Sequence, residues 1–162
     1  MILRLFLVLA FLPLSVHAGE QFWLERLSQN ATAHRAPPAL QREMAGTEHK
    51  DVKDCQEQLG YTDERMANYF AAVRFRVADD SRPVFLVFPS GYCFAFFGAH
   101  SVEFWIVAQN RNGTFKKLLT ARQDGVEILP SKRHGMHDLR SHYNNETRVY
   151  RFDGIIYAES VE

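Results

Sequence analysis

Residues 82–91 read RPVFLVFPSG, and this stretch decides the fold. Its apolar run from Val84 to Phe88 lies between Pro83 and Pro89, is too short for an ordinary helix, and is rich in residues that favour strands. A strand that is apolar on both faces belongs in the interior of a sheet. We therefore expect this run to be a central strand on which the other elements pack.

The next strand is expected at residues 102–109, where the side chains alternate between two faces. Phe104 and Ile106 lie on one face, and Trp105 and Val107 lie on the other. The second face also carries polar residues. We therefore expect it to be mixed rather than fully exposed to solvent.

Asn112-Gly113 predicts a hairpin after this strand, because both residues tolerate positive φ. Residues 115–119 supply the returning strand. The spacing of Phe115 and Leu118 departs from a period of two, so we expect a β-bulge near Lys116-Lys117.

Beyond residue 120 the chain alternates short strands with tight turns, of which Asp124-Gly125 and Asp153-Gly154 are the strongest signals. The expected strands are residues 126–129, 139–143, 147–152 and 155–158. Such closely spaced strands form an antiparallel meander, because parallel pairing needs a longer crossover. The predicted fold class is α+β, with short N-terminal helices packed on a mainly antiparallel, meandering sheet of about seven to nine strands.

The N-terminal half is predicted to be helical and less regular. A short amphipathic helix is expected over residues 20–29, followed by a linker over residues 30–50 with at most one turn around Leu40 and Met44. A better helix runs from Asp51 to Leu59 and ends at Gly60. Thr62 caps a further helix, which gives way to a strand near Ala71. The predicted organisation is an N-terminal helix and linker over 19–50 and one α+β domain over 51–162.

Residues 1–18 have the pattern of a secretory signal peptide. Arg4 supplies the positive charge, Leu5 to Leu14 form the apolar region, and Val16-His17-Ala18 is a small-x-small cleavage site. A permanent membrane span would need about 20 apolar residues, so none is expected. We expect a periplasmic or secreted protein that is cleaved near Ala18.

The predicted secretion of the protein affects whether its two cysteines form a disulfide. Cys55 and Cys93 are the only two, and an even pair in an oxidising compartment indicates a disulfide. This disulfide would join the helix at residues 51–59 to a strand that holds Cys93 in the aromatic stretch after the central strand. The alternative is two buried free thiols.

The charge pattern argues against nucleic acid as a partner. The formal net charge is zero, and the basic residues do not gather into a block that would follow a phosphate backbone. No motif implies a cofactor, and nothing in the pattern predicts an oligomeric state.

His134, His137 and His142, with Asp138 among them, form the densest group of metal-ligand types. Gly135 and the adjoining basic residues favour a solvated surface loop instead. No Gly-x-Ser-x-Gly motif indicates a serine nucleophile. We therefore predict no catalytic residue and no metal, and keep the histidines as weak candidates for a metal-assisted hydrolase.

Aromatic residues are dense around the second cysteine. Most of a chain's large apolar groups must be buried, so the core is the first expectation for them. Their number beside Gly91 and Gly98 exceeds what one sheet face readily covers. The candidates for a surface that contacts a protein partner are Tyr92, Phe94, Phe96, Phe97 and Trp105.

An ordered set of short motifs carries a resemblance over roughly the last 60 residues. The set includes Phe104-Trp105-Ile106-Val107, Glu127-Ile128-Leu129-Pro130 and Tyr150-Arg151-Phe152-Asp153-Gly154. In this order they resemble a group of small bacterial secreted proteins of unassigned activity. The resemblance implies a periplasmic β-rich domain and supplies no reaction.

These observations predict a secreted, non-catalytic binding module, of the inhibitor or immunity type, that acts on an envelope hydrolase or toxin. The alternatives are the metal-assisted hydrolase and a structural envelope component. Three Asn-x-Thr sequons, at Asn30, Asn112 and Asn145, are glycosylation acceptors only in a eukaryotic secretory route and otherwise reflect turn preferences.

Overall fold

The computed structural model describes residues 19–160, so the predicted signal peptide and the last two residues of the chain lie outside the described residues. The elements, in chain order, are β1 (Gln21–Trp23), α1 (Leu24–Gln29), the 3-10 helix η1 (Ala31–His34), α2 (Pro38–Thr47), α3 (His49–Leu59), α4 (Asp63–Met66), β2 (Phe70–Arg74), β3 (Val84–Pro89), β4 (Val102–Gln109), β5 (Phe115–Gln123), β6 (Gly125–Arg133), β7 (Met136–Tyr143), β8 (Glu146–Phe152) and β9 (Tyr157–Ser160). None of these helices is long and apolar enough to cross a membrane.

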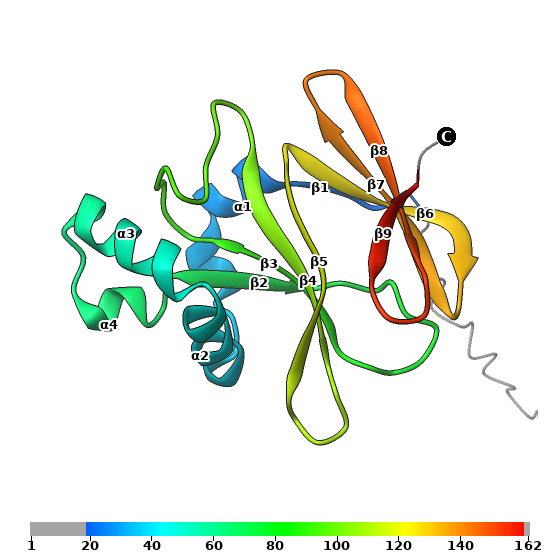
Figure 1. Cartoon of the computed structure of the whole chain (residues 1–162), viewed down its shortest axis with the longest axis horizontal. Coiled ribbons are helices and arrows are strands. Elements are labelled where there is room, and N and C mark those ends of the chain that lie inside the picture. The colour runs from blue at the N-terminus through cyan, green and yellow to red at the C-terminus, as the bar shows by residue number, and fades with distance from the viewer. Residues whose placement is uncertain (1–18, 161–162) are drawn as a thin grey trace, which may run out of the picture.

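All strand pairing in the described chain is antiparallel, and the strands form two sheets (Figure 1). The four-stranded sheet has the order β2-β3-β4-β5, and the five-stranded sheet has the order β1-β6-β7-β8-β9. The predicted α+β class is confirmed. One meandering sheet was expected, whereas the strands divide between two, and this division lets both sheets bury apolar faces against each other.

The chain passes from one sheet to the other at Asp124, the single residue between β5 and β6. The Asp124 amide donates to the His142 carbonyl (2.8 Å), and the Asp124 carbonyl accepts from the Leu24 amide (2.9 Å). β1 then runs close beside Gly125, where a Cβ atom would lie 3.0 Å from the carbonyl oxygen of Phe22. A glycine at this position therefore lets β1 pair with β6.

The predicted central strand is confirmed. β3 lies between β2 and β4, and its side chains enter apolar cores on both sides of the sheet. β4 follows the same alternation, and its second face is mixed as expected, because Trp105 and Val107 are buried whereas Glu103 and Gln109 are half-buried. The helices of the second core cover the apolar part of that face.

The turn predicted at Asp124-Gly125 does not join paired strands, because β5 and β6 belong to different sheets, but other local signals hold. Gly113 has φ 85° in the β4–β5 hairpin, and Asn112 Oδ1 accepts from the Thr114 amide (3.1 Å). The pairing of β4 with β5 skips Leu118 between Leu119 and Lys117, which is the predicted bulge. Gly60 has φ 62° at the end of α3, as a helix C-cap requires.

The first core lies between the two sheets. It combines residues of β3 and β4 with residues of β6 to β9, and Leu24 of α1 joins it. Its largest members include Phe75, Phe88, Phe104, Ile106, Ile128, Leu139, Tyr150 and Phe152. The two sheets are thus held together mainly by the burial of apolar surface.

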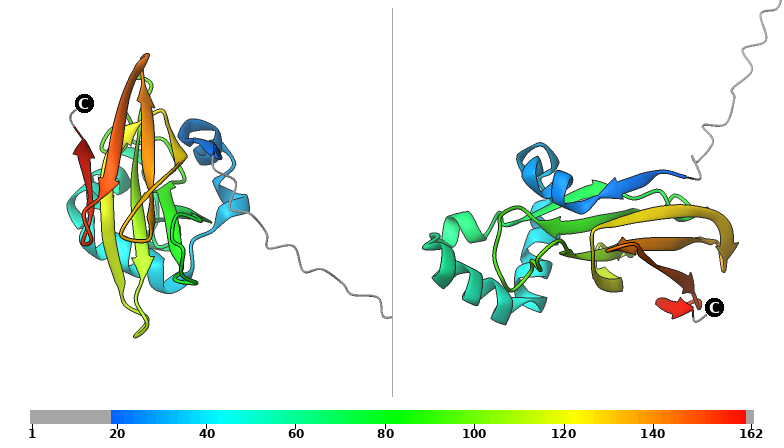
Figure 2. Two further views of the ribbon diagram at one scale, coloured as in Figure 1. Left: turned by 90° about the vertical axis from the view of Figure 1, so that its right-hand side faces the viewer. Right: turned by 90° about the horizontal axis from the view of Figure 1, so that it is seen from above.

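The second core lies between the four-stranded sheet and the helices α2 to α4, which stand away from the five-stranded sheet (Figures 1 and 2). Leu40, Met44 and Cys55 enter it from α2 and α3, and Phe70 and Trp105 enter it from the sheet. The four-stranded sheet is therefore covered on both faces.

Two predictions for the N-terminal segment were wrong. The helix expected over residues 20–29 begins only at Leu24, because residues 21–23 pair with β6 as strand β1. The linker expected over 30–50 contains the ten-residue helix α2. Pro38 is the first residue of α2, a position that proline favours, and so does not break the helix.

Candidate functional site

The loop of residues 90–101, between β3 and β4, contains four of the five aromatic residues predicted for a partner surface. A turn closes on Cys93, whose carbonyl accepts from the amides of Phe96 (3.1 Å) and Phe97 (2.9 Å). The Gly98 amide then donates to the carbonyl of Ser101 (2.7 Å). Backbone hydrogen bonds within the loop thus define part of its conformation.

The predicted disulfide is present. Cys55 of α3 and Cys93 of the loop are bonded, with their Cα atoms 5.5 Å apart, and both residues are fully buried. Next to it, the Phe94 amide donates to Oε1 of Gln58 on α3 (3.1 Å). One covalent and one hydrogen-bonded contact thus fix this part of the loop to α3.

Two further side chains hold the loop backbone, and a third holds the end of β3 just before the loop. The Tyr69 hydroxyl donates to the Gly91 carbonyl (2.6 Å), the Arg122 guanidinium donates to the Ala95 carbonyl (2.5 Å), and the Ser28 hydroxyl donates to the Pro89 carbonyl. Burial raises the pKa of Tyr69 above its ordinary value, and the neighbouring Tyr61 adds to the rise. The Tyr69 hydroxyl therefore stays protonated as a donor at neutral pH.

Two large aromatic side chains of this loop face solvent. Tyr92 is 54% exposed and Phe94 is 69% exposed, and they flank the buried Cys93. The Tyr92 ring contacts the rings of Phe94 (centroids 5.6 Å) and half-buried Phe97 (5.0 Å). We call Tyr92, Phe94 and Phe97 the aromatic surface.

Phe96 and Trp105, also predicted for the partner surface, are fully buried. Their rings pack edge to face (centroids 5.6 Å), and both pack against Phe70 in the second core. They belong to the interior because the helices α2 to α4 cover the sheet face on which Trp105 lies. They therefore form part of the second core and cannot contact a partner.

A hollow of about 320 Å³ adjoins the aromatic surface. Tyr92 and Phe97 form one side, and Glu25 and Ser28 of α1 form another, with His100 also in its lining. A second hollow shares Glu25 and His100 and reaches Trp23, which is 47% exposed. Both hollows lie beside α1, and an exposed aromatic residue lines each of them: Tyr92 lines the first, which we call the recess beside α1, and Trp23 lines the second.

The three candidate metal histidines do not converge. His134 is exposed in the β6–β7 turn, where it has φ 49° beside Gly135 at φ 75°. His137 is buried and its Nδ1 lies 2.5 Å from the Leu129 carbonyl oxygen. His142 is half-buried beside Trp23, with Nε2 3.6 Å from Glu127 Oε2. Within residues 19–160, no group of three or more His, Cys, Asp or Glu residues could hold a metal ion.

The solvated loop predicted for these histidines holds for the exposed turn at His134 and Gly135 but not for His137, which is buried on β7. Residues 132–137 form a tight hairpin between β6 and β7, in which Lys132 pairs with His137. Asp138, next to His137, is buried and accepts from the Ser131 hydroxyl (2.8 Å). Strand pairing on β7 thus takes His137 and Asp138 into the interior, which the local sequence gave no reason to expect.

The acidic residues near turns have structural roles. Asp153 Oδ1 accepts from the amides of Ile155 (2.7 Å) and Ile156 (2.8 Å), and these bonds, that from Ile156 first, lower the pKa of Asp153. Asp80 accepts from the Arg82 side chain and backbone, which lowers the pKa of Asp80. Both carboxylates stabilise the turns in which they lie.

Sequence reasoning missed the residues that fix the loop. Gln58 comes from α3, Arg122 comes from β5 and Tyr69 comes from the segment between α4 and β2, and none lies near the loop in the chain. The paired cysteines were the only local sign that α3 contacts this loop. The recess beside α1 was also missed, because α1 was expected to begin at residue 20.

Comparison of the chain with models of protein families, with curated proteins and with solved structures finds no match. The resemblance to small bacterial secreted proteins therefore stays a prediction.

Proposed function

We propose that this protein is a secreted, non-catalytic binding module that engages a protein partner through the aromatic surface. One observation carries the proposal. Tyr92 and Phe94 expose large aromatic side chains on a loop that a disulfide and several hydrogen bonds hold to the body of the protein. Aromatic side chains held in this way need little ordering when a partner covers them.

The energetics favour a protein partner for this surface. Tyrosine and other large aromatic residues dominate the binding energy of protein interfaces, because they bury much surface for few rotatable bonds. Binding also costs the ordering of loops and side chains. The fixed backbone of the loop lowers that cost, so most of the buried area contributes to affinity.

Two observations support export of the protein. The disulfide between Cys55 and Cys93 fits an oxidising compartment, where such bonds form and persist. The pattern of residues 1–18 adds the prediction of a signal peptide. The proposed site of action is accordingly the periplasm or the exterior of the cell.

Within this class we favour an inhibitor or immunity-type protein that acts on an envelope hydrolase or toxin. A rigid loop with exposed aromatic tips can enter the cleft of an enzyme without rearranging. The recess beside α1 offers a complementary hollow for a side chain of the partner. This choice of partner class depends on the aromatic surface being the contact.

The test uses the full chain, exported by its own N-terminal segment and tagged at the C-terminus. Affinity recovery from the producing cells should give one stoichiometric partner. The variant Tyr92→Ala/Phe94→Ala should lose that partner, and with purified components each single substitution should raise Kd about 30-fold, as expected for central aromatic contacts.

Ile155→Ala is the matched control, because Ile155 is 63% exposed and lies in the β8–β9 turn of the other sheet. This variant should bind like the wild type. Equal affinity of the double variant and the wild type would contradict the proposal. If the purified protein still turned over a substrate after the partner had been removed, the proposal that the module is non-catalytic would be contradicted.

A further inference from the structure

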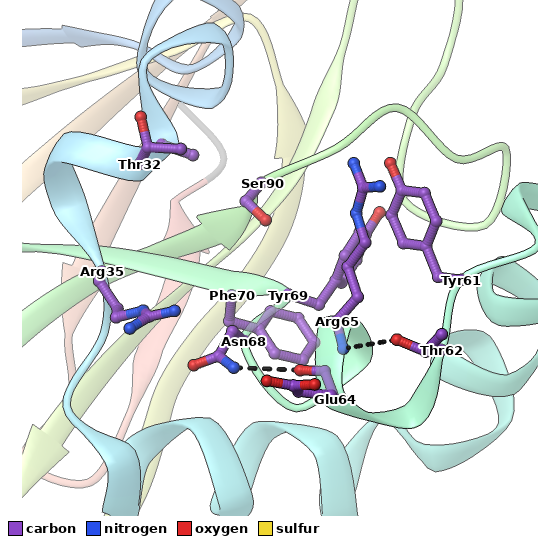
Figure 3. Close-up of a pocket in the computed structure, with 11 residues that line it drawn as sticks. Thr32, Arg35, Tyr61, Thr62, Glu64, Arg65, Asn68, Tyr69, Phe70 and Ser90 are labelled. Carbon is purple, nitrogen blue, oxygen red and sulfur yellow. Dashed lines mark hydrogen bonds between the residues drawn. The ribbon is translucent and has the colours of Figure 1, made fainter.

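A polar cleft of about 540 Å³ lies between η1 and α4, apart from the aromatic side chains just described. Figure 3 shows Arg35 reaching into it from one side and Arg65 standing beside Tyr61 on the other. Phe70 and Ala31 belong to its lining, so the two arginines line a partly apolar hollow from different sides. A cleft of this size is typical of small-molecule sites.

The two arginines are positioned by their surroundings. The Arg65 guanidinium carbon lies 3.8 Å from the centroid of the Tyr61 ring, and Thr62 caps α4 by accepting from the Arg65 amide (3.3 Å). The backbone of Arg35 pairs with Ala71 of β2. Each guanidinium is therefore carried on a fixed stretch of backbone, and stacking on Tyr61 orients one of them further.

Neither guanidinium has a carboxylate partner in the part of the chain that the structure describes. Most ion pairs in the described part of the chain lie elsewhere, on the strands or in the turns between them. Arg35 and Arg65 thus keep their donors directed at solvent in the cleft. Arginine offers a planar set of donors that matches a carboxylate.

The rest of the lining restricts the charge of a ligand. Ser90, Thr32 and Asn68 offer hydroxyl and amide groups, and Glu64 is the one carboxylate in the lining. Two arginines and one glutamate leave a single net positive charge. A singly charged anion matches this balance, whereas a doubly charged phosphate would meet repulsion from Glu64.

We propose that this cleft binds a small ligand through a carboxylate group, which Arg35 and Arg65 hold from opposite sides. Ser90, Thr32 and Asn68 would donate to or accept from the rest of the ligand, as they would from the hydroxyl groups of a sugar acid. This site goes beyond the protein-binding function and does not need Tyr92 or Phe94. Ser90 lines both this cleft and the hollow beside the aromatic surface, so the two sites adjoin.

The experiment is an NMR titration of the full chain with glucuronate, with glucose as the neutral match and inorganic phosphate as the second anion. Glucuronate should shift the side-chain signals of Arg35 and Arg65 and the amide signals of Asn68 and Ser90, in a saturable way. Glucose should leave these signals in place. Arg35→Ala and Arg65→Ala should each raise Kd for glucuronate about tenfold.

Arg111→Ala is the charge-matched control, because it removes an exposed arginine in the β4–β5 hairpin, and it should bind like the wild type. Tyr92→Ala/Phe94→Ala should also retain glucuronate binding, which separates this site from the protein-binding function. Equal shifts with glucose, or equal affinity in Arg35→Ala/Arg65→Ala and the wild type, would overturn the proposal. Tighter binding of phosphate at the same residues would overturn the carboxylate assignment.

Discussion

Tyr69 joins the core to the candidate site through one side chain. Its ring packs on those of Phe70 (centroids 5.6 Å) and Phe96 (5.8 Å), and its hydroxyl donates to the Gly91 carbonyl. Tyr157 has the same arrangement in the five-stranded sheet, where its hydroxyl donates to the His137 carbonyl (2.7 Å). Burial raises the pKa of both tyrosines, because it disfavours the phenolate.

This pair gives a prediction for alkaline pH. A pKa raised in the folded state contributes stability that is fully present below the unfolded pKa of about 10 and is lost as pH rises above it. The wild type should therefore lose stability progressively as pH rises above about 10, measured as the urea midpoint at several pH values.

Tyr69→Phe/Tyr157→Phe is the comparison for that prediction. Each substitution removes one hydrogen bond, so the variant should be less stable by about 1 kcal/mol per site at pH 7. Its stability should nevertheless fall less steeply on the alkaline side. Parallel curves for the two proteins would show that neither hydroxyl resists ionisation.

At the scale of elements, the site depends on the contact between α3 and the loop of residues 90–101. α3 presents Cys55 to the second core and Gln58 to the loop backbone, three residues apart on one helix face. The Gly60 cap ends α3 where the chain must turn towards α4. The exposure of Tyr92 and Phe94 on either side of Cys93 follows from this attachment.

Removing the disulfide should affect both stability and binding. Its two cysteines are 38 residues apart, so Cys55→Ala/Cys93→Ala should lower the free energy of unfolding by about 4 kcal/mol if loop closure dominates. Amide hydrogen exchange should also quicken in the loop and in α3 more than in β6 to β8. Urea unfolding and exchange at single amides measure the two effects.

Gln58→Ala is the milder control for the same contact. It removes only the hydrogen bond to the Phe94 amide, so stability should fall by about 1 kcal/mol. Binding of the partner should weaken less than in the disulfide variant. A disulfide variant with an unchanged exchange pattern in the loop would refute the claim that α3 holds the loop in place.

At the scale of the whole molecule, α1 connects the two sheets. It contacts β3 and β4 of the four-stranded sheet and β6 of the five-stranded sheet, and Figure 2 shows it running over the point where the sheets meet. Leu24 is fully buried there in the first core. The segment predicted to be an N-terminal helix and linker therefore completes the fold rather than preceding it.

Leu24→Ala tests whether the two sheets unfold together. A buried leucine truncated to alanine typically costs about 2 to 5 kcal/mol, and the loss should appear equally in the exchange protection of both sheets. Ile155→Ala, at an exposed site, should change stability little. Loss of protection in one sheet alone would show that the sheets are independent units.

Local patterns alone determined much of the fold. The central strand at residues 84–88, the Asn112-Gly113 hairpin, the Gly60 cap and the Thr62 cap are confirmed, because each depends on the conformational preferences of a few adjacent residues. The disulfide is confirmed as well, since only one pairing of two cysteines exists.

The tertiary structure decided which aromatic residues are exposed and which residues meet. Phe94 and Phe96 lie two residues apart in one aromatic stretch, yet Phe94 faces solvent and Phe96 lies in the second core. Tertiary structure also brings Arg35 and Arg65, which lie 30 positions apart in the chain, into the lining of one cleft. The burial of a side chain and its neighbours depend on which distant parts of the chain pack against it. Turns and helix caps depend on adjacent residues, so only turns and caps can be predicted from the local sequence.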